Sequence, residues 1–229
     1  MTNHSCIACG REIVDGTKFQ ICKDCFCNLH KLEGNLCDKC GDEVLKDNQL
    51  CDHCKTFDYS FQQNKSFCYY EKVSAKIVKG LKYGHRKFYA KHVAEMMTEN
   101  KDYFEDVDII TFVPINKRRM KERGFNQAEE IAREISLILN KPVDCLILKS
   151  DSAKHQAGLS QKERLENLKG TFSVDEANKN KIKGKTILIV DDVFTTGATL
   201  SECANVIKKL KPNKIKTLTF AKTKFLSKV

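Results

Sequence analysis

Two neighbouring aspartates follow an apolar run near the C-terminus, in the stretch ILIVDDVFTTGATL at residues 187–200. Adjacent carboxylates repel each other, so we expect Asp191 and Asp192 to serve a ligand such as a sugar diol or Mg²⁺. The residues after them offer backbone N–H groups and hydroxyls at a helix N-terminus, which suits a phosphate. These residues are Thr195, Thr196, Gly197, Ala198 and Thr199. The stretch lacks Gly-Lys-[Ser/Thr], which disfavours hydrolysis of nucleoside triphosphates.

A second candidate site is basic and follows an expected strand. Five cations stand within seven residues, and they repel one another unless an anion lies near, so we favour an anion site over a solvated loop. Arg123 is the best candidate for a phosphate contact because a guanidinium fork suits that geometry. We expect Asn126 to cap the next helix and Phe125 to be core or a stacking platform. The five cations are Lys117, Arg118, Arg119, Lys121 and Arg123.

The N-terminal segment is rich in cysteine. Four Cys-x-x-Cys units occur there, and each can offer two sulfurs to one tetrahedral ion from a tight turn, which predicts two structural zinc ions. Twelve residues separate the first two units and ten separate the last two, which favours consecutive pairing, although an interleaved pairing stays open. Cys27, His30 and His53 are possible substitute ligands but more simply bystanders. A thioredoxin-like dithiol is a weaker reading, because it needs a single unit at a strand–helix junction. The eight expected ligands are Cys6, Cys9, Cys22, Cys25, Cys37, Cys40, Cys51 and Cys54.

Charge divides the 229-residue chain. Residues 1–60 hold seven Lys/Arg against ten Asp/Glu, a net charge of −3, and the remainder holds 33 against 20, a net of +13. The basic surplus suggests a polyanionic partner for the larger part. The first residues lack the regions of a signal peptide, and no run approaches the roughly 18–20 apolar residues of a membrane span. We therefore expect a cytoplasmic protein without membrane insertion, with a zinc-binding domain at 1–58 and a second domain at 59–229.

Strand-like and helix-like patterns alternate in the second domain, which predicts an α/β fold with a mostly parallel sheet and helices on both faces. A polar stretch at 150–160 suggests a mobile loop, after which Ser160 and Glu163 would cap a helix. Cys68, Cys145 and Cys203 are expected to be buried. Strands are expected at 65–72, 106–115, 142–149, 185–190 and 214–221, and helices at 73–84, 87–100, 124–140, 161–170 and 199–211. In such a sheet, ligands bind at the carboxyl ends of the strands, where the aspartate pair falls.

Three separated motifs point to one family. ILIVDDVFTTGATL resembles the loop that binds phosphoribosyl pyrophosphate (PRPP) in type I phosphoribosyltransferases. VPINKRRMKERGFNQAEEIA follows the second expected strand, and KHQAGLSQKERLENLKGTF resembles the loop that closes over PRPP in that fold. Together with the cysteine-rich head, these stretches make the whole chain similar to the ComF family of competence proteins of natural transformation, ComFC type. The resemblance implies a type I phosphoribosyltransferase-like sheet behind a small zinc-binding domain.

The resemblance also implies roles for residues. Asp191 and Asp192 would be the catalytic pair and meet the ribose hydroxyls or Mg²⁺, and the loop from Thr195 to Thr199 would bind the 5′-phosphate. The turn from Pro114 to Lys117 would lie at the pyrophosphate. In the expected mobile loop, Lys154, His155 and Gln156 would close over the ligand, while Arg164 and Asn167 would hold that loop to the domain or, as the alternative, contact the ligand.

Two functions are consistent with these features. The first, implied by the resemblance to the ComF family, is a competence protein that handles incoming single-stranded DNA and has a site for PRPP or a related phosphorylated sugar. The resemblance also implies that the zinc head contacts a helicase-like ATPase. The five cations at 117–123 would then contact the DNA backbone. The alternative is an active phosphoribosyltransferase acting on a nucleobase or amine. No base-recognition element is recognisable in the sequence, which favours the first function.

Overall fold

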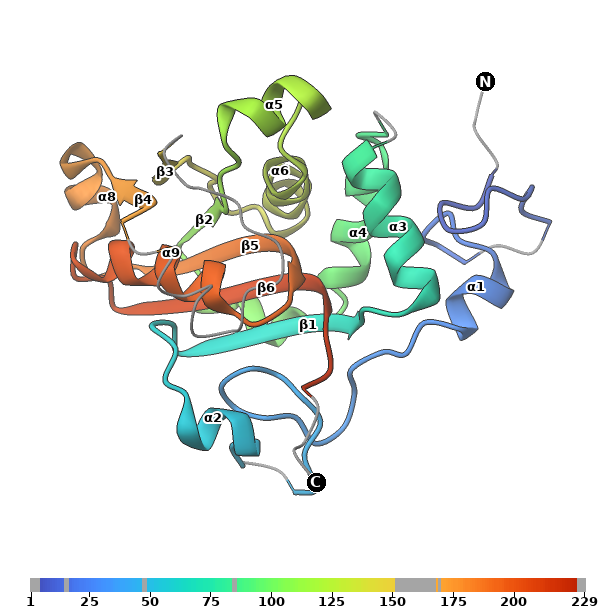
Figure 1. The fold of residues 1–229 in the computed structure, drawn as a ribbon, viewed down its shortest axis with the longest axis horizontal. Coiled ribbons are helices and arrows are strands. Elements are labelled where there is room, and N and C mark those ends of the chain that lie inside the picture. Colours follow the sequence, from blue (N-terminus) through green and yellow to red (C-terminus); the bar gives the residue numbers. More distant parts are fainter. Residues whose placement is uncertain are drawn as a thin grey trace.

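A sheet of four parallel strands forms the centre of the computed structural model, which describes residues 5–14, 17–46, 49–83, 86–150, 168 and 170–225. The strand order is β1-β6-β5-β2 (Figure 1). Parallel neighbours need long crossover connections, and helices supply them here. The strands are β1 (Gln63–Tyr69), β2 (Ile109–Phe112), β5 (Thr186–Phe194) and β6 (Lys214–Lys222). The expected parallel α/β architecture is confirmed.

Helices cover both faces of the sheet because the strands are apolar on both sides. In β5, Leu188 and Val190 pack into a core with α3, α4 and α6, whereas Ile187 and Ile189 pack into a second core with α9. The sheet therefore separates two hydrophobic cores. The helices are α3 (Lys72–Tyr83), α4 (Tyr89–Met97), α5 (Lys117–Arg123), α6 (Gln127–Leu139), α8 (Lys179–Ile182) and α9 (Ala198–Lys208), with 3-10 turns at Lys101–Phe104 and Glu176–Asn178.

The strand expected at 142–149 is mostly wrong. Val143 makes only an isolated parallel bridge with Ile110, and the chain then turns away, with the Leu146 N–H donating to Thr111 Oγ1. Only β3 (Ile147–Lys149) is regular, and it pairs antiparallel with β4 (Phe172–Val174), a strand that the sequence did not predict. Cys145 lies in the turn before β3 and is exposed, so its expected burial is wrong, whereas Cys68 and Cys203 are buried as expected.

The strand expected to end at Val190 runs four residues further. β5 continues to Phe194 because β6 extends beside it to Lys222, and the register pairs Asp191 with Thr219 and Phe194 with Lys222. Asp191 and Asp192 are therefore strand residues rather than the start of a loop. Among the described residues, no helix combines the length and apolar character needed to cross a membrane.

The cysteine-rich segment contains two small ribbons built alike. In each, a glycine with positive φ follows a Cys-x-x-Cys turn, at Gly10 and Gly41, and its N–H donates to the carbonyl oxygen of Cys6 or Cys37 at 2.9 Å. A five-residue helix then carries the last cysteine of each ribbon, in α1 (Lys23–Cys27) and α2 (Asp52–Thr56). In Figure 1 the first ribbon lies beside α3 and the second lies below β1.

Each ribbon belongs to a different core. The first contributes Cys6, Ile7 and Phe19 to the core that contains α3, α4 and α6. The second contributes Cys37, Cys40 and Cys54 to the core that contains α9. The ribbons are thus packed into the same two cores that cover the sheet.

Candidate phosphate and metal sites

The aspartate pair lies in the last third of β5. The Asp192 N–H donates to Asp191 Oδ1 at 2.8 Å, which orients the first carboxylate beside the second residue's backbone. Asp191 is half-buried and Asp192 is buried. Burial, reinforced by the Asp192 carboxylate, raises the pKa of Asp191 to about 7. A carboxylate that is costly to ionise alone is well suited to a cation or to sugar hydroxyls that stabilise its charge.

Two lysines that the sequence analysis missed interact electrostatically with this pair, and Lys82 contacts it directly. Lys82, in the last turn of α3, forms an ion pair with Asp192 Oδ2 at 2.8 Å. Lys149, at the end of β3, has a lowered pKa because of burial and the nearby Arg119, while Asp191 acts in the opposite direction. The two aspartates therefore differ, because Asp192 is engaged by Lys82 and Asp191 is the more accessible carboxylate. Neither lysine belongs to a motif, so the sequence offers no local signal for them.

The loop after β5 ends at the N-terminus of α9, which has eleven residues. Gly197 precedes the helix with φ of 74°, a left-handed conformation that favours glycine. The Thr196 hydroxyl accepts from the Ala198 N–H at 3.4 Å, and the Thr223 hydroxyl donates to the Thr195 carbonyl oxygen at 2.9 Å. The loop thus presents the positive end of a helix dipole next to Asp191, an arrangement that can hold a phosphate.

The basic cluster forms a helix, α5, rather than a loop. Asn116 caps its start by accepting from the Arg119 N–H at 2.9 Å, and Gly124 ends it with φ of 77°. The side chains of the cations therefore point in different directions around the helix instead of toward one point. Lys117, Arg118 and Lys121 are exposed.

Arg123 turns into the protein instead. It is 8% exposed, its Nη1 donates to Gln127 Oε1 at 2.9 Å, and its guanidinium lies 5.4 Å from the centre of the Tyr83 ring. Asn126 caps α6 by accepting from the Ala128 N–H, as expected, and Phe125 is buried core. An anion would reach Arg123 only after local rearrangement, so the exposed cations of α5 are the accessible ones.

The two ribbons bring the eight expected cysteines together in two groups of four, in consecutive order. Within each group the sulfur atoms lie within 4.8 Å of one another, with 3.9 Å between the sulfurs of Cys9 and Cys22 and 3.6 Å between those of Cys40 and Cys51. Zinc–sulfur bonds of about 2.3 Å in a tetrahedron set sulfur atoms roughly 3.8 Å apart, so both groups fit zinc. Four thiolates fill the coordination sphere, which makes these sites structural rather than catalytic.

The three candidate bystanders have other surroundings. Cys27 is exposed, and His30 lies between the carboxylates of Glu43 and Glu71 at 3.4 and 3.5 Å. The His53 Nε2 lies 2.8 Å from the Tyr59 hydroxyl oxygen. Among the described residues, both metal-binding groups consist of cysteine alone. Most of the helix expected at 161–170 lies outside the described residues, as do Lys154, His155, Gln156, Ser160, Glu163, Arg164 and Asn167.

Comparison with known proteins supports both halves of the chain. Residues 88–224 match the phosphoribosyl transferase domain and residues 3–55 match the double zinc ribbon domain. The chain is 26% identical to competence protein F of Haemophilus influenzae, over 91% of this chain and 92% of that protein. It is 25% identical to competence protein ComFC of Bacillus subtilis, over 89% of this chain and 85% of that protein. It is also 25% identical to the DNA utilization protein YhgH of Escherichia coli, over 82% and 83% of the two chains.

These matches confirm the resemblance to the ComF proteins and the structural zinc expected from the cysteine spacing. The phosphoribosyl transferase match includes β5, the loop after it and α9, where the aspartate pair and the helix N-terminus lie. The chain belongs to the phosphoribosyltransferase domain family, and a double zinc ribbon precedes that domain as part of a ComF-type protein.

Proposed function

We propose that this protein handles single-stranded DNA in natural transformation, and that it binds Mg²⁺–PRPP or a related phosphorylated sugar at the carboxyl end of β5. The observation that supports this ligand assignment is the phosphate loop at the N-terminus of α9, beside the accessible carboxylate of Asp191. The names of the relatives, two competence proteins and a DNA utilization protein, favour this role over the alternative of a salvage transferase. The proposal includes a cytoplasmic location and a helicase-like ATPase as partner.

In this proposal each group has a distinct task. The N-terminal turn of α9 and the Thr196 hydroxyl would hold the 5′-phosphate, and Asp191 would accept hydrogen bonds from the ribose or bind the Mg²⁺ that accompanies pyrophosphate. Lys149 would add positive charge near the leaving pyrophosphate, because its charge interacts with that of Asp191. Lys82 would hold the Asp192 side chain in place beside Asp191 through its ion pair.

Asp191→Asn tests the ligand site. We expect the affinity for Mg²⁺–PRPP to fall roughly 10- to 100-fold, because a charged hydrogen-bond acceptor is lost. The melting temperature should not fall, because the amide removes the repulsion between two adjacent carboxylates. Calorimetric titration gives the affinity, and Asp58→Asn, on a carboxylate that is 95% exposed, is the matched control. Equal affinities for wild type and Asp191→Asn would refute the site.

The DNA surface is tested at the exposed cations of α5. We expect Lys117→Glu, Arg118→Glu and Lys121→Glu together to weaken single-stranded DNA binding and to reduce the slope of log Kd against log salt by about 2, at about 0.7 per phosphate contact. The control reverses three other exposed lysines: Lys208 at the end of α9, Lys209 directly after it, and Lys183 directly after α8. An equal loss of slope in both variants would mean that only net charge matters.

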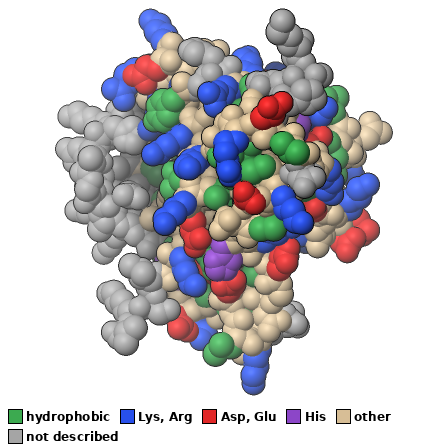
Figure 2. Space-filling view, turned by 90° about the vertical axis from the view of Figure 1, so that its right-hand side faces the viewer, with side chains coloured by type: hydrophobic (Ala, Val, Ile, Leu, Met, Phe, Trp, Pro, Cys, Tyr) green, Lys and Arg blue, Asp and Glu red, His purple; other side chains and the backbone are tan. Residues whose placement is uncertain are grey.

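The choice of α5 also follows from the distribution of charge. The face shown in Figure 2 mixes Lys and Arg side chains with Asp and Glu rather than gathering one sign of charge. A nucleic-acid backbone gains little from such a mixture. In α5 only Glu122 offsets the cations, at 3.6 Å from Arg118.

A further inference from the structure

The phosphate loop is in contact with a buried tyrosine that directly follows the second zinc ribbon. Tyr59 is 2% exposed, and its hydroxyl donates to the Thr196 carbonyl oxygen at 2.9 Å. Its ring also covers the backbone of Gly197, where an added Cβ would lie 2.5 Å from the nearest ring carbon. One residue later, the Ser60 N–H donates to the hydroxyl of Ser201 in the first turn of α9, at 3.0 Å. The segment after the ribbon therefore contacts both the end of the loop and the first turn of α9.

The tyrosine is connected in turn to the second cysteine group. The His53 Nε2 lies 2.8 Å from the Tyr59 hydroxyl oxygen, and because that hydroxyl donates to Thr196, the histidine nitrogen carries the proton and donates to the tyrosine. His53 lies in α2 between Cys51 and Cys54. A five-residue helix has little stability of its own, so its position depends on the zinc that these two cysteines hold.

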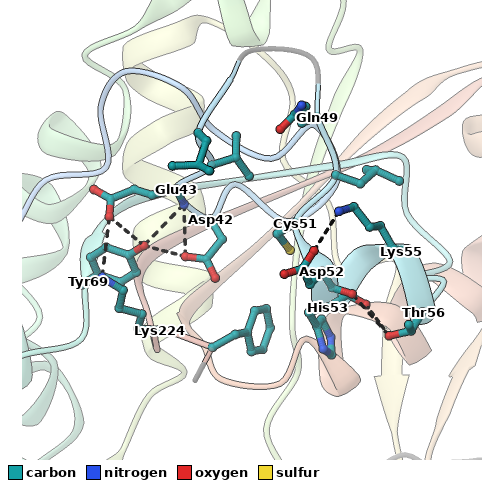
Figure 3. Close-up of a pocket in the computed structure, with 14 residues that line it drawn as sticks. Asp42, Glu43, Gln49, Cys51, Asp52, His53, Lys55, Thr56, Tyr69 and Lys224 are labelled. Carbon is teal, nitrogen blue, oxygen red and sulfur yellow. Dashed lines mark hydrogen bonds and ion pairs between the residues drawn. The ribbon is translucent and has the colours of Figure 1, made fainter. Parts of the chain in front are cut away.

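The second ribbon is accessible from solvent next to this connection. A pocket of about 860 Å³ lies between two walls, with Cys51 and His53 on one and Asp42 and Tyr69 on the other (Figure 3). Asp42, which lines the pocket, pairs with the fully buried Lys222 at 3.0 Å and accepts a hydrogen bond from the Tyr69 hydroxyl at 2.5 Å. These contacts attach the ribbon to the carboxyl-terminal ends of β1 and β6. The phosphate loop lies at the same end of the sheet.

The first ribbon is differently placed. Its cysteines pack into the core with α3, α4 and α6, on the opposite face of the sheet from α9. The two ribbons are alike in local structure, but only the second packs into the hydrophobic core that contains α9, the helix that follows the phosphate loop. This difference gives each ribbon a separate expected effect on the ligand site.

We propose that zinc binding in the second ribbon sets the ligand affinity of the phosphate loop, with Tyr59 as the positioning residue between them. The inference rests on the proposed function, because it takes the loop after β5 as the PRPP site. Zinc fixes α2, α2 fixes His53, and His53 and Tyr59 hold the Thr196–Gly197 backbone in the shape that directs N–H groups at a phosphate. Loss of that zinc releases the loop without any change to the residues that touch the ligand.

Tyr59→Phe tests this connection, because it keeps the packed ring and removes only the hydroxyl. We expect the affinity for Mg²⁺–PRPP to fall roughly five- to tenfold, the effect of one buried hydrogen bond. The matched control is Tyr103→Phe, which also removes a buried hydroxyl that donates to backbone oxygens. These are the carbonyl oxygens of Thr217 at 2.9 Å and Gln63 at 3.2 Å, and Gln63 is at the start of β1, away from the phosphate loop. Equal affinities in the two variants would overturn the proposal.

Ribbon-selective loss of zinc is the second test. Cys51→Ser and Cys22→Ser each remove one half-buried sulfur from one group. We expect each variant to retain one zinc per chain, with reduced PRPP affinity in Cys51→Ser alone. If both variants fold and bind PRPP equally well, the second ribbon has no special role. If Cys51→Ser does not fold, Tyr59→Phe decides.

Hydrogen exchange separates this inference from the ligand assignment. Without ligand, we expect the amides of residues 198–201 to exchange about five- to tenfold faster in Tyr59→Phe than in wild type, and unchanged in Tyr103→Phe. Wild-type protein that binds no PRPP would refute the proposed function alone, while unchanged exchange in Tyr59→Phe would refute the positioning role alone.

Discussion

Removal of both zinc ions is expected to unfold the whole chain, not only its first 55 residues. The first ribbon contributes Cys6, Ile7 and Phe19 to one core, and the second contributes Cys37 and Cys40 to the other. Structural zinc binding is worth about 10–16 kcal/mol per site, comparable to or greater than the roughly 5–15 kcal/mol by which a whole domain is stable. Without zinc, no bonds hold the four sulfur atoms of each group together, so neither ribbon keeps the shape that packs into its core.

Circular dichroism and zinc content measured together test this expectation. Under reducing conditions, a strong chelator should remove close to two zinc ions per chain, and the signal of the central sheet should decline in step with zinc loss. The same chelator saturated with zinc beforehand is the control. A sheet that melts at an unchanged temperature after both ions are gone would show that the ribbons are independent appendages.

Those features of the molecule that depend on short-range patterns could be predicted from the sequence. The four Cys-x-x-Cys pairs could be predicted, because such a turn places its two sulfurs together regardless of the rest of the fold. The sequence favoured consecutive pairing of these units without excluding an interleaved one, and the structure has the consecutive groups. The parallel sheet followed from apolar runs that alternate with amphipathic helices. Asn126 was predicted as a helix cap because its side chain bonds to the backbone two residues on.

Features that depend on distant partners could not be predicted. The length of β5 is set by β6, which pairs with it as far as Phe194. Lys82 is one of many helix lysines, and only the fold brings it to Asp192. Arg123 suggested a phosphate ligand by its chemistry, yet the path of α5 turns it towards Tyr83 and Gln127. Tyr59 gave no signal at all, because its contact with Thr196 spans 137 residues of sequence.

Gly197→Ala is expected to abolish ligand binding and to destabilise the protein by roughly 2–4 kcal/mol. Part of this is backbone strain, since a φ of 74° costs an alanine about 1–2 kcal/mol. The larger part is steric, because the new Cβ would lie 2.5 Å from carbons of both the Phe194 and Tyr59 rings. Those rings are buried among other aromatics, with Tyr59 stacked on Phe61 and edge-to-face with Phe194, so the loop backbone must move instead.

Gly184→Ala isolates the two contributions. Gly184 has a φ of 71° but nothing within 4 Å of an added Cβ, so this control has the backbone strain but not the steric clash. Thermal melting should show a small loss for Gly184→Ala and a larger one for Gly197→Ala, and calorimetry should show intact Mg²⁺–PRPP binding only in the former. Equal stability and equal binding in both variants would mean that the loop adapts freely. The close packing of Tyr59 on Gly197 would then have no part in shaping the phosphate site.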